Sequence, residues 1–208
     1  ETYEDLDAMV DLAHKILEIG RKYKVPGLKK PIQITVSASS FVPKAQTPFQ
    51  WLGQEDKESI GQKQEYLREA FRKNSKIKFN THNLNTSFLE ASFARGDRRL
   101  GKVLYRAWQL GCKFDGWTEF FRYDLWESAF MLCGISPTYY ANMNYNDTDI
   151  LPYDHISCGV SKKWLWQELQ KAKQGITTLD CRQGPCNGCG ICPTLQVDQV
   201  YVKRKEND

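Results

Sequence analysis

The sequence contains no apolar run that approaches the roughly 20 residues needed to cross a bilayer, so we expect no membrane-spanning segment and no membrane partner. It contains no internal repeat and no low-complexity tract. It also lacks a G-x-S-x-G nucleophile motif and a Walker phosphate loop, and no isolated cysteine has a local catalytic signature. The usual short motifs therefore identify no catalytic chemistry.

A signal peptide is absent as well. The first residue is Glu1 rather than Met, and the chain begins directly on a helix cap. We interpret the sequence as a fragment whose amino-terminal part, with any secretion signal, is not included.

Cysteines are present, but three of the seven are isolated. Cys112, Cys133 and Cys158 lie in or beside apolar stretches, whereas a disulfide scaffold distributes its cysteines to connect loops. This pattern favours a reducing compartment, and we expect a cytoplasmic protein.

The composition is that of a folded chain. With 208 residues, six Trp, ten Tyr and ten Phe, it can bury a core of one large or two small domains and is not typical of disorder. A net charge of +4 is mild and does not by itself imply binding to nucleic acid.

Helical and strand patterns alternate in the first part of the chain. Residues 3–23 show the apolar spacing of an amphipathic helix, 32–36 a β-branched strand, 55–73 a second helix and 76–79 a short second strand. Alternation of this kind favours a parallel α/β sheet. The pattern changes after that, and we place a domain boundary near residue 85.

The loop after the first predicted strand contains Pro43 and Pro48, which stop both strand and helix. Ligands of parallel α/β folds bind at the carboxyl ends of strands, so this loop is a candidate binding site. The alternative is a rigid connection in which Phe41, Phe49 and Trp51 fill the core.

The second half is predicted to be mainly helical, with segments at 87–94, about 100–108, 118–133 and 161–172. Residues 135–158 show no period and are rich in Tyr, Asn and Asp. The residues expected to face the core from the third segment are Phe121, Leu125, Ala129 and Leu132.

Four cysteines near the carboxyl end form the strongest signal. Cys181, Cys186, Cys189 and Cys192 have the spacing C-x4-C-x2-C-x2-C. Thiolates bind soft or borderline metals, and four of them satisfy either a tetrahedral zinc site or the corners of an iron–sulfur cluster. The C-x2-C-G element resembles a zinc knuckle, while the uninterrupted C-x2-C-x2-C run is typical of ferredoxin-type clusters. The spacing is compatible with a zinc site and with an iron–sulfur cluster, and we favour the iron–sulfur cluster.

A basic stretch begins at Arg95 and continues into the next predicted helix, which we expect Asp97 to cap. Arg98, Lys102 and Arg106 recur every four residues, and Arg99 lies beside the first. Either these side chains bind a phosphate or a carboxylate, or they form an ordinary solvated face. The second interpretation suits Lys102 and Arg106, whereas Arg98 and Arg99 stay candidates for substrate or phosphate binding because arginine in a first helical turn opposes the helix dipole.

Several segments together resemble radical S-adenosylmethionine (SAM) enzymes, in particular an uncharacterised bacterial branch that usually carries an amino-terminal cobalamin-binding domain. The resemblance covers nearly the whole chain, and its most specific part is the cysteine run. The matching segments are Glu1–Leu6, Ser39–Lys44 with Thr47–Trp51, Ala94–Leu100, Phe114–Trp117, Leu151–Ile156 and Asp180–Cys192.

The resemblance implies a division of the chain into three parts. Residues 1–85 are expected to be the closing βα units of a partial TIM barrel of the radical SAM type. Residues 86–175 are expected to be a mostly helical extension, and 176–208 a metal-binding tail. It also implies that a 4Fe–4S cluster, held by a C-x3-C-x2-C loop that this chain lacks, generates a 5′-deoxyadenosyl radical.

The same resemblance implies cofactors and partners. Glu1, Phe41 and Pro43 match positions near bound SAM, and the cysteine run would be an auxiliary iron–sulfur or zinc site. Cobalamin is a further candidate cofactor, and an electron donor such as flavodoxin or ferredoxin is expected. Relatives that share the proline-containing loop include methylthiotransferases, so methyl or methylthio transfer to RNA or a ribosomal protein is the expected reaction class. The alternative hypothesis is a zinc-stabilised RNA- or protein-binding module without catalysis.

Overall fold

The amino-terminal helix, α1, spans Tyr3–Lys22 in a computed structural model that describes residues 1–24, 27, 31–182 and 184–197. A capping box begins it, as the sequence predicts. The Asp5 amide donates to Thr2 Oγ1 at 3.3 Å, and the Thr2 amide donates to an Asp5 carboxylate oxygen at 2.7 Å. Four amides at a helix start lack partners within the helix, and this exchange satisfies two of them.

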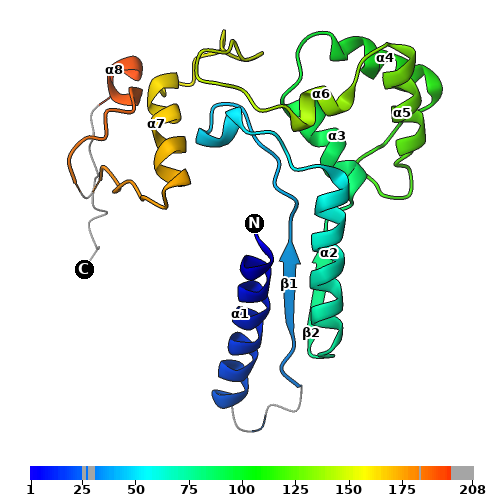
Figure 1. The fold of residues 1–208 in the computed structure, drawn as a ribbon, viewed down its shortest axis with the longest axis vertical. Helices are drawn as coiled ribbons and strands as arrows, with labels where there is room; N and C mark the ends of the chain where they lie inside the picture. The colour runs from blue at the N-terminus through cyan, green and yellow to red at the C-terminus, as the bar shows by residue number, and fades with distance from the viewer. Residues whose placement is uncertain (25–26, 28–30, 183, 198–208) are drawn as a thin grey trace, which may run out of the picture.

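A pair of parallel strands follows. β1 (Ile34–Ala38) pairs with β2 (Ile77–Thr81), with Ile34 opposite Ile77, and α2 (Lys57–Arg72) connects them. α1 and α2 pack together on this sheet (Figure 1). The buried side chains of this layer are Leu6, Ala13, Leu17, Leu67, Phe71 and Ile77.

The prediction of a partial TIM barrel is wrong. Half of the described residues are helical, and these residues contain one sheet of only two strands. The alternation of helix and strand correctly predicted a parallel βαβ unit, but an alternating pattern does not specify how many strands share the sheet. Two strands of five residues cannot close into a barrel, which needs about eight tilted strands.

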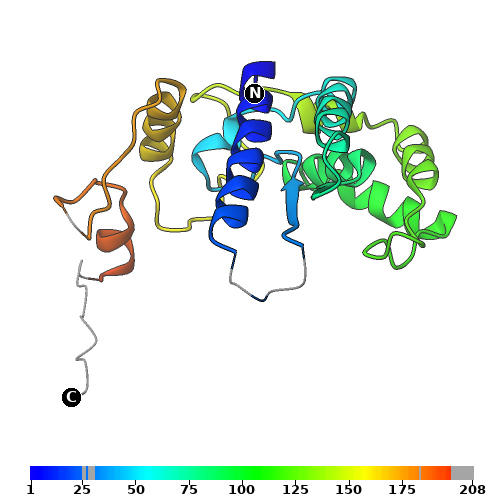
Figure 2. The same cartoon turned by 90° about the horizontal axis from the view of Figure 1, so that it is seen from below.

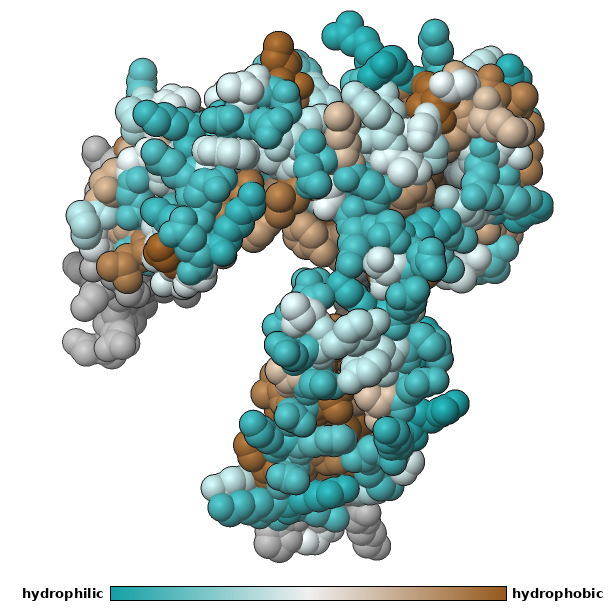
Figure 3. Space-filling model, in the orientation of Figure 1, coloured by the Kyte–Doolittle hydropathy of each residue, from teal (hydrophilic) through white to brown (hydrophobic). Residues whose placement is uncertain are grey.

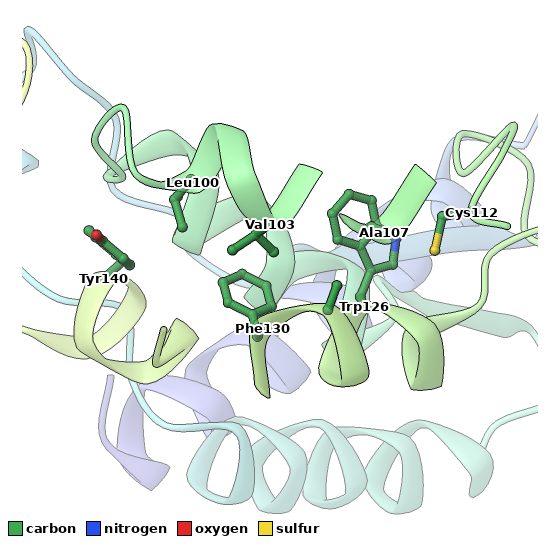
Figure 4. Close-up of a cluster of buried hydrophobic side chains, with 8 residues drawn as sticks. Leu100, Val103, Ala107, Cys112, Trp126, Phe130 and Tyr140 are labelled. Atoms are coloured by element: carbon green, nitrogen blue, oxygen red, sulfur yellow. The ribbon is translucent and has the colours of Figure 1, made fainter. Parts of the chain in front are cut away.

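Four helices form a second layer of the molecule: α3 (Leu84–Ala94), α4 (Leu100–Leu110), α5 (Tyr123–Leu132) and α6 (Pro137–Asn142). α4 turns its buried face to α5, with Val103 and Ala107 against Trp126 and Phe130 (Figure 4). Gly134 ends the α5 segment at φ 63°, as glycine does after many helices. Leu132, predicted to face the core, is instead 59% exposed.

Two helices belong to the carboxyl-terminal part, α7 (Lys162–Lys173) and the short α8 (Ile191–Leu195). The Ser161 hydroxyl caps α7 by accepting from the Trp164 amide at 3.1 Å. Both views place α8 and α4 on opposite sides of the molecule (Figures 1 and 2). Residues 198–208 of the predicted metal-binding tail lie outside the described residues.

The loop between β1 and α2 joins these parts. It contains the short 3-10 helix η1 (Pro48–Trp51), and Trp51 is fully buried against Leu151, Leu165 and Leu169. Trp166 of α7 meets the Trp51 ring edge-on at 5.1 Å. Trp51 therefore fills the core, as one of the two interpretations of the sequence expected, but that interpretation is wrong for Phe41 and Phe49, which are 49% and 38% exposed. The division of the chain at residue 85 stays a prediction.

No helix in the described part of the chain is both long enough and apolar enough to cross a membrane.

Candidate functional site

A pocket of about 550 Å³ opens at the carboxyl end of β1. Because β1 ends at Ala38 and the chain turns away at Ser39–Phe41, the strand end is left uncovered between the starts of α1 and α2. A volume of this size is in the range of small-molecule sites. The side chains that line it are Glu1, Leu6, Met9, Ser37, Ala38, Ser39, Ser40, Phe41, Leu52, Glu55, Ile60, Lys63, Gln64 and Leu67.

The pocket combines apolar walls with a few polar groups. Lys63 Nζ lies 2.7 and 2.8 Å from the two carboxylate oxygens of Glu55. The Gln64 amide donates to Ser40 Oγ at 3.3 Å. An ion pair and an oriented amide in an apolar pocket can select a ligand that carries both charge and a flat hydrophobic part.

Two of the three residues assigned to SAM by resemblance lie in this wall. Glu1 and Phe41 line the pocket, and Phe41 keeps 49% of its surface exposed. Pro43 does not line it, because its side chain is fully buried in the loop. The carbonyl of Phe41 accepts from Gln54 Nε2 at 2.9 Å, which fixes the backbone beside the pocket.

Arg95 lies in a different environment from Arg98 and Arg99. Arg95 is fully buried, and its guanidinium donates to the carbonyls of Tyr140 (2.6 Å), Ala141 (3.0 Å) and Met143 (2.5 Å). Its Cζ also lies 4.9 Å from the centre of the Tyr145 ring. Burial lowers the pKa of Arg95 from its ordinary value. This arginine holds the end of α3 to the segment that contains α6.

Arg99 and Arg98, the predicted phosphate or substrate ligands, are exposed at the start of α4. Arg99 donates to the Asp97 carboxylate through Nε at 3.0 Å and Nη2 at 2.6 Å, and hydrogen bonding from Arg99 lowers the pKa of Asp97. Asp97 does not cap α4: the cap position is Arg99, without a side-chain cap. Arg98 forms no ion pair within the described ranges, so of the two it is the one available to a ligand.

The cysteine tail folds back onto the start of α7. The Ser161 amide donates to the Cys189 carbonyl at 2.8 Å, and Trp164 Nε1 donates to the Asn187 carbonyl at 3.0 Å. Gly190 adopts φ 99°, where a Cβ atom would lie 3.1 Å from the Gly159 carbonyl oxygen. A larger residue there would be strained and crowded, so this glycine is required for the close approach.

Local bonds also order the segment before the second cysteine. Arg182 donates to Asp180, and these hydrogen bonds lower the pKa of the Asp180 carboxyl to about 2. The Thr178 hydroxyl donates to Glu168 at 2.6 Å, and Lys171 pairs with the same carboxylate at 2.7 Å. These contacts connect the start of the tail to α7.

The four thiols are suitable metal ligands by their chemistry, but the structure does not bring them together at the positions it describes. Four thiols within twelve residues are a complete donor set for zinc or an iron–sulfur cluster. In the part of the chain that the structure describes, no three His, Cys, Asp or Glu side chains converge closely enough to hold a metal ion. The Gly188 amide donates to Cys186 Sγ at 3.4 Å, which is how backbone amides orient a thiolate ligand.

The sequence did not lead us to predict that Glu55, Lys63 and Gln64 line a pocket. It also did not lead us to predict that Arg95 is buried and holds two segments together. Glu55 and Lys63 are eight residues apart, and only the start of α2 brings them together. Arg95 carried a possible signal, because it follows the apolar face of α3 directly and is succeeded by glycine.

No family model, curated protein or solved structure matches this chain. The structure brings Glu1 and Phe41 to one pocket. It places Arg98 and Arg99 at α4, and the four cysteines near α8 on the other side of the molecule (Figure 1).

Proposed function

We propose that the chain is part of a radical SAM enzyme, in which the pocket beside β1 contributes to binding SAM and the cysteine run holds an auxiliary metal. The observation that carries this proposal is the pocket itself. It lies at the carboxyl end of a parallel strand, and its wall contains Glu1 and Phe41, two residues that the resemblance relates to SAM.

The pocket residues offer a partner for each part of SAM. The half-exposed Phe41 ring presents a flat surface to adenine, and the Ser39 and Ser40 hydroxyls suit ribose. The Glu1 and Glu55 carboxylates suit the cationic sulfonium and ammonium groups, while Lys63 suits the ligand carboxylate.

On this proposal the cluster that cleaves SAM is held outside these 208 residues, since the chain contains no C-x3-C-x2-C loop. When bound, such a cluster supplies the electron that breaks a carbon–sulfur bond of SAM. The residues described here would bind and orient the cofactor beside it. Cobalamin would be a second cofactor, a flavodoxin or ferredoxin the electron donor, and the cytoplasm the compartment. The proposed reaction is methyl or methylthio transfer to RNA or a ribosomal protein.

The SAM site is tested by isothermal titration of the full protein with SAM. Phe41→Ala removes one base–aromatic stack, worth about 1–3 kcal/mol, so we expect the Kd to rise at least about fivefold. Gln62→Ala is the matched control, because Gln62 is exposed on the same helix as Gln64 but does not line the pocket. Equal affinities for wild type and Phe41→Ala would contradict the proposed site.

The auxiliary metal is tested by iron, zinc and acid-labile sulfide analysis of these 208 residues purified anaerobically, because they lack the C-x3-C-x2-C loop and their metal content reports on the tail alone. Iron and sulfide that disappear in the double variant Cys186→Ala/Cys189→Ala, but persist in Cys133→Ser, support an auxiliary cluster. Binding would draw the four thiols together, because a metal site rarely exists preformed without its metal. One zinc without sulfide would instead indicate a structural zinc that clamps the tail to α7.

A further inference from the structure

Aromatic side chains crowd the exposed side of α4 and the loop that follows it, where Figure 3 shows hydrophobic side chains over α4 and α5. Trp108 is 56% and Phe114 66% exposed, although rings of this size are normally at least half buried. We call this region the α4 surface. Its exposed large side chains are Leu104, Tyr105, Trp108, Phe114, Trp117 and Phe120.

These rings are held outward by the fold. Leu100, Val103 and Ala107 occupy the buried face of α4, so Tyr105 and Trp108, three residues apart, share the opposite flank. Their rings stack at 5.7 Å with an interplanar angle of 29°. A groove of about 600 Å³ lies between them and the following loop.

The loop itself is ordered by hydrogen bonds. Phe114 has φ 58°, a left-handed conformation that is costly for a bulky residue. Its carbonyl accepts from the Trp117 amide at 3.0 Å, and the Trp117 carbonyl accepts from the Phe120 amide at 3.0 Å. The Phe114 ring lies 6.1 Å from Trp117 and 6.0 Å from Phe120. The rings of the loop therefore form one cluster beside the groove.

Positive charge accompanies the rings. From Arg98 to Phe114 the sequence contains five basic residues and no acidic one. Arg98, Lys102, Arg106 and Lys113 are all exposed, and none of them forms an ion pair in the described ranges. Lys102 and Arg106 are one helical turn apart and adjoin Tyr105. The nearby acids are Asp97, which pairs with Arg99, Asp115, which accepts from Trp126 Nε1 at 3.3 Å, and the exposed Glu119.

We propose that the α4 surface binds single-stranded RNA, with bases stacking on Tyr105, Trp108 and the Phe114 cluster and phosphates contacting Arg98, Lys102, Arg106 and Lys113. Exposed rings beside unpaired cations are the combination that single strands require, because each nucleotide presents one flat base and one negative charge. A protein interface also uses exposed aromatic rings and arginine, but its core is depleted of charged residues, whereas here cations without ion pairs lie beside the rings, which suits a polyanion. RNA is preferred to DNA because folded RNAs keep unpaired loops and ends. The inference does not depend on the SAM pocket or the cysteine tail.

The test is fluorescence anisotropy with a labelled 12-nucleotide RNA of mixed sequence, titrated with the full protein at several salt concentrations. Trp108→Ala and Tyr105→Ala should each weaken binding about 5- to 150-fold, the measured range for loss of one base stack. The double variant Lys102→Ala/Arg106→Ala should reduce the slope of log K against log salt by about 1.4, since each lost phosphate contact removes about 0.7 for a single strand. All four side chains are exposed, so unchanged thermal melts are expected.

Matched controls lie on α1 and at Tyr23, the residue that caps its carboxyl end. Tyr23→Ala removes a ring that is 71% exposed, and Lys15→Ala/Arg21→Ala removes two exposed charges; neither should change RNA binding.

Four outcomes would overturn the proposal. They are no binding by folded protein at about 100 µM, equal binding by Trp108→Ala, binding of a duplex as tight as that of the single strand, and tighter binding of the DNA of the same sequence. A dimer in light scattering that Trp108→Ala dissociates would assign the surface to a second copy of the chain and would overturn it as well.

Discussion

Replacing Arg95 should destabilise the protein far more than replacing either arginine that follows it. The Arg95 side chain is fully buried and donates to three backbone carbonyls of the segment that contains α6. Arg95→Ala leaves those carbonyls without this donor and empties the space beside the Tyr145 ring. The neighbouring Arg99 is an exposed residue paired with Asp97, so Arg99→Ala is a matched control.

The expected magnitude follows from these contacts. A hydrogen bond to a charged donor contributes about 1.5–3 kcal/mol, but the three share one guanidinium whose burial is itself costly, so they do not add. Arg95→Ala removes the charge itself and leaves neutral carbonyls without this donor, and an unsatisfied buried polar group costs about 1–3 kcal/mol, so we expect a loss of about 3 kcal/mol for Arg95→Ala. Because domains unfold with only about 5–15 kcal/mol, this is a large fraction of the total. Arg99→Ala should cost less than about 1 kcal/mol.

Urea unfolding followed by tryptophan fluorescence measures both changes. Arg95→Lys, which retains the charge but not the planar fork of donors, should fall between wild type and alanine and keeps the comparison usable where Arg95→Ala does not fold. The reasoning fails where Arg95→Ala lies within about 1 kcal/mol of wild type, or where Arg99→Ala is the more damaging change.

Two further predictions concern backbone contact and pH. In Gly53→Ala the new Cβ would lie 2.1 Å from the carbonyl oxygen of Asn142, so we expect urea unfolding to show a stability loss of about 3 kcal/mol. Gly101 has open space around it, so Gly101→Ala should be neutral or slightly stabilising. Equal effects of the two substitutions would contradict the close contact at Gly53. At Glu168, burial raises the pKa, but hydrogen bonds, among them one from Lys171, outweigh it and the net pKa is below the ordinary value of 4.5. The Glu168 carboxylate therefore stabilises the fold above about pH 4.5, and this stabilisation is lost as the pH falls. Glu168→Gln should make the melting temperature depend less steeply on pH between about pH 3 and 5. An unchanged slope of melting temperature against pH would contradict this.

Local signals predicted much of the secondary structure. The Thr2–Asp5 capping box depends on contacts a few positions apart, and the parallel strand pair was predicted from the alternation of helix and strand patterns. α6 was missed, since six residues do not complete two turns of an apolar pattern, although Ser136 and Pro137 form an ordinary start. The number of strands was predicted wrongly for a related reason: local periodicity contains no count of distant neighbours.

The candidate site was predictable to a smaller extent. The loop after β1 was identified as a binding position from strand order alone, and Phe41 lies in the pocket there. Pro43 was assigned by proximity in sequence, yet its side chain turns into the core. Arg95, rather than Arg98 or Arg99, is the buried arginine because it binds carbonyls of residues 140–143, about 45 positions away. The sequence around the arginines contains no information about a contact so far along the chain.

The burial of Trp51 has a consequence for synthesis of the chain. Its edge-on partner, Trp166 of α7, is about 115 residues further along the chain. At translation rates of 5–20 residues per second, the loop around Trp51 waits roughly 6–23 s on the ribosome before that partner is made. During this interval the Trp51 indole lacks the partner that buries it, so we expect chaperones to bind the nascent chain until α7 emerges.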